Sequence, residues 1–199
     1  PEPRDLMRLA RRAADRLEAL ADTLPDAPAP GPVRLMPRID AGWALRRLAT
    51  PGFAARPVGA DGAPAETGPS ALWFGACTRA VTIADRLRAR AAVLRLALPD
   101  DPALFVDGGR ACAVVETGRG PLALGVELSP DGTIAHAASV APTEWLLHPD
   151  GALAAAVVGL PASDATVRHA GRVIMSLDPC VDVRVKLHSA VEGRMAVHA

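Results

Sequence analysis

The chain lacks a net charge, because 22 Lys and Arg residues balance 22 Asp and Glu residues among its 199 residues. A neutral chain has no overall field that would attract the phosphates of nucleic acid or an anionic membrane surface. It also lacks a charged-then-apolar leader and any apolar run as long as a membrane span. The sequence therefore predicts a cytoplasmic protein without a nucleic-acid or membrane partner.

Cysteine is scarce as well. The three cysteines, Cys77, Cys112 and Cys180, are too few and too scattered for a disulfide framework, and no two have the C-x-x-C spacing of a zinc or redox site. Neither a P-loop nor a G-x-G-x-x-G is present, and there are no internal repeats. A zinc site made of Cys180, His188 and Cys112 is an alternative, but it has no local pair of ligands.

What the chain does have is a hydrophobic content of 50%, enough for one substantial core or two small ones. Apolar residues at helical spacing predict helices over residues 5–24, 41–48 and 71–98, with Cys77 as part of the core in the third. Arginines on the first helix alternate with acidic residues, which favours a solvated face over a nucleic-acid patch.

Two stretches rich in proline separate these helices. Residues 25–32 hold four prolines, which predicts an extended linker. Residues 57–69 are rich in Gly, Ala and Pro, a composition typical of either a disordered connector or a functional loop laid over a core. Connectors are the commoner case, so the sequence favours a connector.

The second half changes to short apolar runs at residues 111–116, 122–128 and 133–140. Glycine-containing turns separate them, so we expect a three-stranded antiparallel meander. Two further helices are predicted over residues 152–160 and 164–175.

The turn of the first hairpin places Arg119 between Gly118 and Gly120. Glycines let the backbone turn sharply and can bring a guanidinium close to a planar or anionic group. An exposed turn arginine without a ligand is the commoner alternative.

A cysteine follows a proline in Ser176-Leu177-Asp178-Pro179-Cys180. Proline fixes its own φ and has no amide donor, so Cys180 should lie at a stiff corner. Apolar residues then alternate with polar ones over residues 181–188, which predicts a half-buried strand. A lone cysteine is more often a small buried hydrophobe than a ligand.

These patterns together predict an α+β fold, mainly helical, with a small antiparallel three-stranded meander and a C-terminal strand. We expect one domain over residues 1–199, with a helical half and its Pro-rich linkers (1–98) and a half that carries the meander and Cys180 (99–199). Because the first residue is proline rather than methionine, we also expect an upstream segment to be missing.

Four separated pieces resemble, in the same order, the large subunit of nickel–iron hydrogenases and its non-catalytic relative, the hydrogenase expression and maturation protein of the HupK/HoxV type. They lie at residues 61–69, 115–122, 140–151 and 176–180. The resemblance covers about two thirds of the chain and implies a hydrogenase large-subunit-like fold.

In that family the active site holds an iron with carbon monoxide and cyanide ligands. The resemblance implies that Arg119, and Thr143 beside Pro142, donate hydrogen bonds to the cyanides, which a guanidinium suits because it is always charged. It also implies that Cys180 is a thiolate ligand, the soft donor that such a metal prefers.

The chain departs from the catalytic pattern at several positions. Val183 stands where a second cysteine is needed, Lys186 where the family has a histidine, and Gly118 where it has a proline. No complete nickel site is expected, so the resemblance implies a protein that is not an enzyme. Such a scaffold would bind the Fe(CN)2(CO) unit transiently, with the maturation chaperones and the hydrogenase large subunit as partners.

Two alternatives stay open. The first alternative to a scaffold is that the chain is part of a truncated or divergent catalytic large subunit. The second is that it is a vestigial relative in which Cys180 binds no metal. An upstream Arg-x-Cys-Gly-x-Cys would favour the first, and metal analysis would separate the second from a scaffold.

Overall fold

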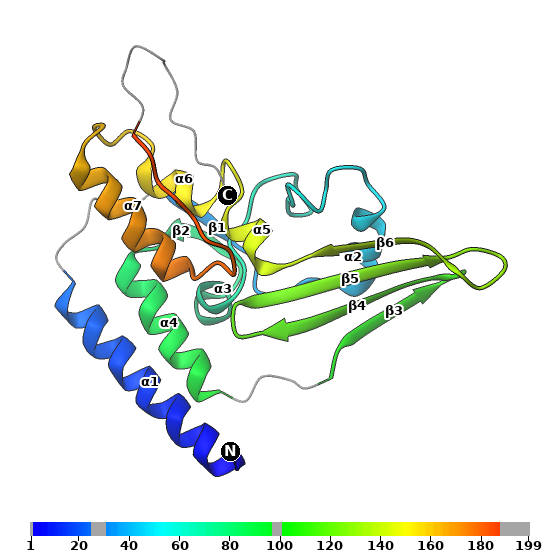
Figure 1. The fold of residues 1–199 in the computed structure, drawn as a ribbon, viewed down its shortest axis with the longest axis horizontal. Coiled ribbons are helices and arrows are strands. Elements are labelled where there is room, and N and C mark those ends of the chain that lie inside the picture. Colours follow the sequence, from blue (N-terminus) through cyan, green and yellow to red (C-terminus); the bar gives the residue numbers. More distant parts are fainter. Residues whose placement is uncertain (1, 25–30, 97–100, 188–199) are drawn as a thin grey trace.

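The computed structural model describes residues 2–24, 31–96 and 101–187, and they form an α+β fold (Figure 1). The helices are α1 (Pro3–Thr23), α2 (Ala41–Leu48), α3 (Pro69–Phe74), α4 (Ile83–Arg95), α5 (Pro142–Leu146), α6 (Ala152–Val157) and α7 (Asp164–Leu177). The strands are β1 (Pro32–Leu35), β2 (Cys77–Ala80), β3 (Ala103–Asp107), β4 (Arg110–Thr117), β5 (Gly120–Leu128) and β6 (Ile134–Val140). No helix in these residues is both long enough and apolar enough to cross a membrane.

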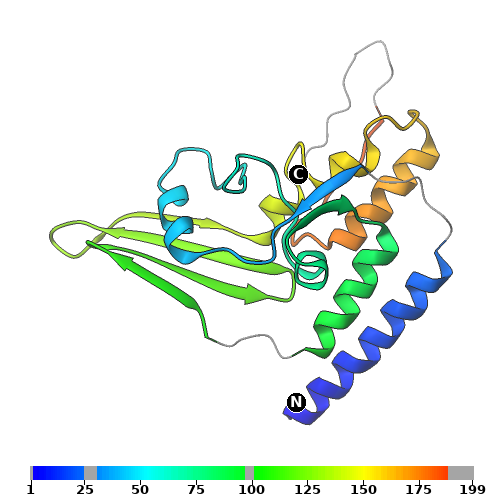
Figure 2. The same ribbon diagram turned by 180° about the vertical axis from the view of Figure 1, so that it is seen from behind.

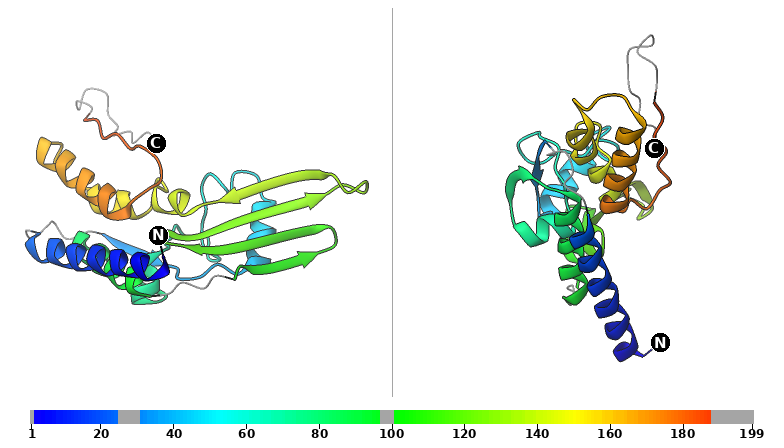
Figure 3. Two further views of the ribbon diagram at one scale, coloured as in Figure 1. Left: turned by 60° about the horizontal axis from the view of Figure 1, so that its bottom comes forward. Right: turned by 90° about the vertical axis from the view of Figure 1, so that its left-hand side faces the viewer.

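A four-stranded antiparallel sheet, in the order β3-β4-β5-β6, extends to one side of the molecule (Figures 1 and 3). Three of its strands are those of the predicted meander, but the count of three was wrong. Strand β3 adds an edge because Gly108 and Gly109, with φ of 52° and 85°, turn the chain back into β4. Helix α2 packs against the face of the sheet that carries Cys112, Val114, Ala123 and Val140.

The helices α1, α4 and α7 lie side by side at the other end of the molecule (Figures 1 and 2). They share a core with β1, α3 and α6, built from small and branched apolar side chains such as Ala21, Leu35, Val81, Leu153 and Val173. The predicted first two helices, and those over 152–160 and 164–175, are present as α1, α2, α6 and α7.

The single helix predicted over residues 71–98 was wrong. Gly75, with φ of 74°, ends α3, and the chain continues as β2, which pairs antiparallel with β1. Helix α4 begins later, at a capping box in which Thr82 and Asp85 satisfy each other's backbone amides. Cys77 therefore lies exposed on β2 instead of in the core.

The prolines of the first half do not simply separate elements. Residues 25–30 of the predicted linker lie outside the described residues, and Pro32 begins β1. Residues 57–69 form no disordered connector, because Glu66 hydrogen-bonds Arg34 and Met36 through its backbone and its side chain is 2% exposed. The alternative, a loop laid over a core, describes this segment.

The predicted C-terminal strand was also wrong in the part that the structure describes. Residues 181–187 form no named strand, and Val181 and Leu187 are 45% and 37% exposed. The alternation is real, since Val183 and Val185 are half-buried, but a strand also needs a partner edge. His188 lies outside the described residues.

Candidate functional site

The site begins where α7 ends. Asp178 has φ of 53° and ψ of 56°, the one left-handed non-glycine conformation among the described residues, and its amide still donates to the carbonyl of Ile174 at 2.9 Å. Pro179 follows and cannot continue the helix. The turn leaves Cys180 exposed, so the interpretation of this cysteine as a small buried hydrophobe was wrong.

Thr143 contacts Cys180 in two ways. The Cys180 amide donates to Thr143 Oγ1 at 3.1 Å, and the same oxygen lies 3.0 Å from Cys180 Sγ. Because the hydroxyl accepts from the amide, its own hydrogen is free to point at the sulfur or at a group bound there. Two predicted site residues that are 37 positions apart are thus in direct contact.

Helix α5 holds Thr143 in place through its neighbours. Pro142 occupies the first turn, where a missing N–H costs nothing, and the Glu144 carboxylate accepts the amide of Ala141 at 2.9 Å. Trp145 is fully buried, with its ring centroid 6.1 Å from that of Phe53. Pro142 and Thr143 are themselves buried, so the hydroxyl is presented from a rigid element.

Arg119 approaches from the β4–β5 turn. Its Nε lies 2.9 Å from the backbone oxygen of Asp178 and 3.1 Å from Asp178 Oδ2. The structure thus brings Arg119 to the residue two positions before Cys180.

Two hydrogen bonds of the Thr117 side chain fix the backbone of this turn. Thr117 Oγ1 donates to the Gly120 carbonyl at 2.7 Å and accepts the Arg119 amide at 3.2 Å. A Cβ on Gly68 would lie 2.2 Å from the Arg119 carbonyl oxygen, and a Cβ on Gly120 would lie 2.9 Å from Gly68 Cα. Gly68 in the motif at residues 61–69 and Gly120 in the motif at residues 115–122 therefore let these two loops contact each other.

Arg90 is a site residue that no sequence pattern indicates. It lies in the middle of α4, yet its Nη1 forms an ion pair with Asp178 Oδ2, and its Nη2 donates to the Leu177 carbonyl at 3.4 Å. Two guanidinium groups thus share one carboxylate. The Arg90 side chain is 17% exposed and that of Arg119 is 47% exposed, so Arg90 forms the buried side of the arrangement.

A second ion pair lies close to Arg90 and Arg119 and is buried. Glu66 and Arg86 are 2% and 3% exposed and form a bidentate pair at 2.7 and 3.1 Å, while Arg86 also donates to the Val81 carbonyl. A narrow gap runs from this pair to Arg90 and Arg119. Thr67 Oγ1, which lies in the lining of the gap, is buried without a hydrogen-bond partner among the described residues. The motif at residues 61–69 contains Glu66 and Thr67, but the sequence predicted no contact for either residue.

The other cysteines do not join Cys180 in a recognisable ligand set. In the described part of the chain no three His, Cys, Asp or Glu residues are grouped so that they could hold a metal ion. Cys112 is buried in the core between the sheet and α2, where desolvation raises the pKa of its thiol. The zinc alternative therefore has no grouped ligands among the described residues, and its third ligand, His188, lies outside them. The expectation of an incomplete nickel site stays a prediction.

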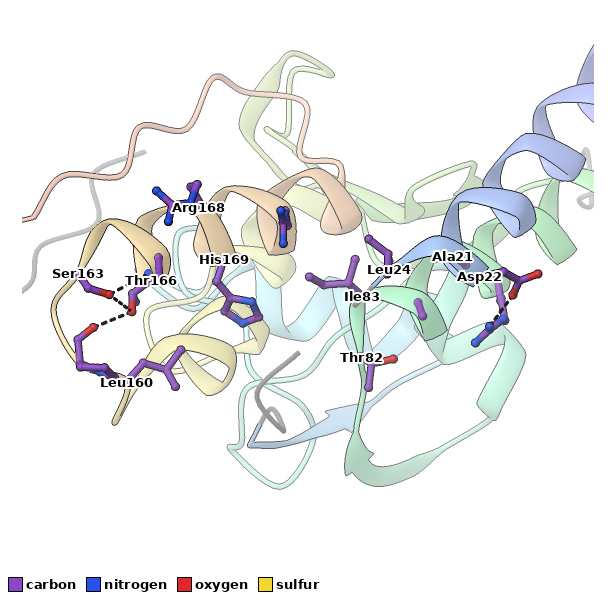
Figure 4. Close-up of a pocket in the computed structure, with 15 residues that line it drawn as sticks. Ala21, Asp22, Leu24, Thr82, Ile83, Leu160, Ser163, Thr166, Arg168 and His169 are labelled. Carbon is purple, nitrogen blue, oxygen red and sulfur yellow. Dashed lines mark hydrogen bonds and ion pairs between the residues drawn. The ribbon is translucent and has the colours of Figure 1, made fainter. Parts of the chain in front are cut away.

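A larger hollow, of about 740 Å³, lies between the C-terminus of α1, the N-terminus of α4 and α7. Figure 4 shows His169 pointing into it, with Leu24 and Ile83 on the opposite side. None of the predicted site residues lines this hollow. The exposed turn that carries Cys180 instead borders a second hollow, of about 670 Å³, whose lining includes Asp178, Pro179 and Val181.

Comparison with solved structures gives a chain of an NAD+-reducing [NiFe]-hydrogenase in its H2-reduced state, at a TM-score of 0.45 and 16% identity. The match covers 90% of this chain and 59% of that chain. This likeness is too low to establish a shared fold, so the large-subunit-like fold stays a prediction. No family model matches the chain.

Two curated proteins are similar in sequence. The hydrogenase expression/formation protein HupK of Rhizobium leguminosarum bv. viciae is 32% identical over 151 residues, which are 67% of this chain and 41% of HupK. The hydrogenase expression/formation protein HoxV of Cupriavidus necator is 37% identical over 102 residues, which are 49% of this chain and 26% of HoxV. The chain spans less than half the length of either relative. It is a homologue of the HupK- and HoxV-type hydrogenase expression/formation proteins, the type that its four motifs resemble.

Proposed function

We propose that this chain belongs to a maturation scaffold that binds the Fe(CN)2(CO) unit transiently and passes it to a hydrogenase large subunit. The observation that carries the proposal is the contact between Cys180 and Thr143, with a guanidinium on the adjoining Asp178. The names of the two relatives support a role in hydrogenase formation. The scaffold would work in the cytoplasm together with the maturation chaperones.

Each side chain has a distinct part in this proposal. The Cys180 thiolate binds the iron, and the Thr143 hydroxyl donates to a cyanide nitrogen. Arg119 offers its terminal nitrogens to the second cyanide, since of its guanidinium nitrogens only Nε donates a hydrogen bond to the described residues. These donors satisfy ligand atoms that would otherwise lose their hydrogen bonds to water on binding.

The charges at the site favour such a ligand. Arg90 and Arg119 share the single carboxylate of Asp178, which leaves one surplus positive charge next to Cys180. Cyanide ligands and a thiolate both carry negative charge, so the surplus stabilises the bound state.

The same site argues against turnover. Val183 stands where the catalytic pattern has the second cysteine of the pair that begins at Cys180. A single protein ligand retains the iron unit less firmly than several would, which suits a donor. We therefore propose a role other than that of an enzyme.

Infrared spectroscopy tests this function directly. The full-length protein, co-produced with the maturation proteins, should show bands of metal-bound CO and CN together with bound iron. Cys180→Ser should lose both bands and iron, whereas Cys77→Ser, which changes the other exposed cysteine, should keep them. Absence of the bands in the unmodified protein, or their persistence in Cys180→Ser, would overturn the proposal.

A further inference from the structure

The turn that carries Cys180 is held in an unfavourable backbone conformation. Left-handed φ and ψ are uncommon at a non-glycine residue and are kept where the surroundings fix them. Asp178 also precedes a proline, which restricts its backbone further. Something outside the turn must therefore keep it in place.

The candidates are the two guanidinium groups on Asp178. Arg119 sits on a hairpin turn, is nearly half exposed and contacts the turn through Nε alone. Arg90 projects from the middle of a regular helix, is largely buried, and contacts both the Asp178 carboxylate and the Leu177 carbonyl. A charged hydrogen bond is stronger where water is excluded, so the contact of the less exposed Arg90 should dominate.

We infer that Arg90 is a positioning residue, which fixes Asp178 and through it sets the place of Cys180 against Thr143. The chain of contacts runs from Arg90 to Asp178, and across Pro179 to the Cys180 amide on Thr143. Asp178 in turn holds Arg119 by Nε and leaves its terminal nitrogens for a ligand. The value of this placement for iron binding rests on the proposed function; the placement itself does not.

Amide hydrogen exchange of Cys180, followed by NMR, measures the placement without any metal. The Cys180 amide is hydrogen-bonded only while the turn keeps its place against Thr143. Arg90→Met should raise the exchange rate of this amide about tenfold or more, as expected when a charged hydrogen bond to the turn is lost. Arg90→Lys should restore part of the protection, because it keeps a charge within reach of Asp178.

Two controls separate this role from a general loss of stability. Arg88→Met changes a neighbour on the same helix whose partner is Asp22, and it should leave the Cys180 amide protected. Arg119→Met should change it less than Arg90→Met does. Equal protection in Arg90→Met and the unmodified protein, or equal loss in Arg88→Met, would overturn the inference.

A double-mutant cycle keeps the test decisive should Arg90→Met unfold. Asp178→Asn removes the charge but keeps a residue that tolerates left-handed φ. It should accelerate exchange at Cys180 as Arg90→Met does, and Arg90→Lys should then have little further effect, because the two residues act through one contact. Additive effects would overturn the inference.

Iron loading separates this inference from the proposed function. Arg90→Met protein, co-produced with the maturation proteins, should retain less iron than Arg88→Met protein. If the unmodified protein never shows CO and CN bands, the proposed function fails while the exchange experiment still decides the role of Arg90.

Discussion

Thr143 Oγ1 lies 3.0 Å from Cys180 Sγ and accepts the Cys180 amide at 3.1 Å, so one hydroxyl holds both the backbone and the sulfur of the cysteine. The hydroxyl belongs to α5, and the cysteine follows α7. The relationship therefore depends on how these two helices are anchored, and it can be tested separately from any metal.

Thr143→Val removes the hydroxyl at almost constant shape. We expect a loss of about 1 kcal/mol in the free energy of unfolding, because the Cys180 amide loses its partner but stays near water. Thr143→Ser should stay close to the unmodified protein. Urea unfolding of the three proteins measures the difference, and a Thr143→Val protein as stable as Thr143→Ser would contradict it.

Gly68→Ala and Gly120→Ala should both destabilise the protein by roughly 1–3 kcal/mol or more. Their φ values are 84° and 129°, and an added Cβ at either position would meet the other loop at less than 3.0 Å.

Gly118→Ala is the matched control in the same turn, since a Cβ there meets nothing within 4 Å and its φ is not positive. It should change the free energy of unfolding far less. If all three variants unfold at the same denaturant concentration, the close contact between the two loops is absent in solution.

Arg86→Met leaves the Glu66 carboxylate buried without its charge partner. We expect a loss of about 3–5 kcal/mol in the free energy of unfolding. The double variant Glu66→Gln with Arg86→Met should recover much of it, because no buried charge then remains. Arg88→Met, at the exposed pair with Asp22, should cost within about 1 kcal/mol. Thermal or urea unfolding decides, and equal losses in Arg86→Met and Arg88→Met would contradict the role of burial.

How far the sequence predicts this fold depends on the range of the interactions. Helix α2 and the strands β4 to β6 follow from local periodicity and short turns, and they were predicted within a few residues. Strand β2 pairs with β1, more than forty positions away, and no local pattern shows that pairing. The Thr82 and Asp85 capping box and the Gly108-Gly109 turn were readable signals that were missed.

The site residues also differ in whether a local sequence pattern or only a long-range contact reveals them. Arg119, Thr143 and Cys180 were selected from motifs, and the structure brings Thr143 to Cys180 and Arg119 to Asp178. Their roles toward a metal unit remain predictions. Arg90 was missed because its partner lies 88 positions away and an arginine on a helix is ordinarily a solvated residue. Only the packing of α4 near α7 gives it a function at the site.

Glu116 in the Arg119 motif gives a prediction on pH. Burial raises the pKa of its carboxyl, an effect that Arg38 opposes only in part, and Oε2 has no partner in the described part of the chain. The folded protein then holds this proton at pH values where the unfolded chain has lost it, so stability falls as pH rises from about 4.5 through the raised pKa. Glu116→Gln should raise the melting temperature at pH 7, with the gain disappearing below pH 4.5.

Asp131→Asn should act in the opposite direction at pH 7. Hydrogen bonds from Thr133 lower the pKa of Asp131, so the charged form stabilises the fold above the unfolded pKa of about 3.8, and this contribution is lost as pH falls through the lowered value. Asn keeps an acceptor oxygen but loses the charge, so the melting temperature should drop slightly at pH 7, and the difference from the unmodified protein should shrink as pH falls toward 3. Differential scanning fluorimetry between pH 3 and pH 8 compares both variants, and a Glu116→Gln effect that is constant over this range would mean that the carboxyl is not desolvated.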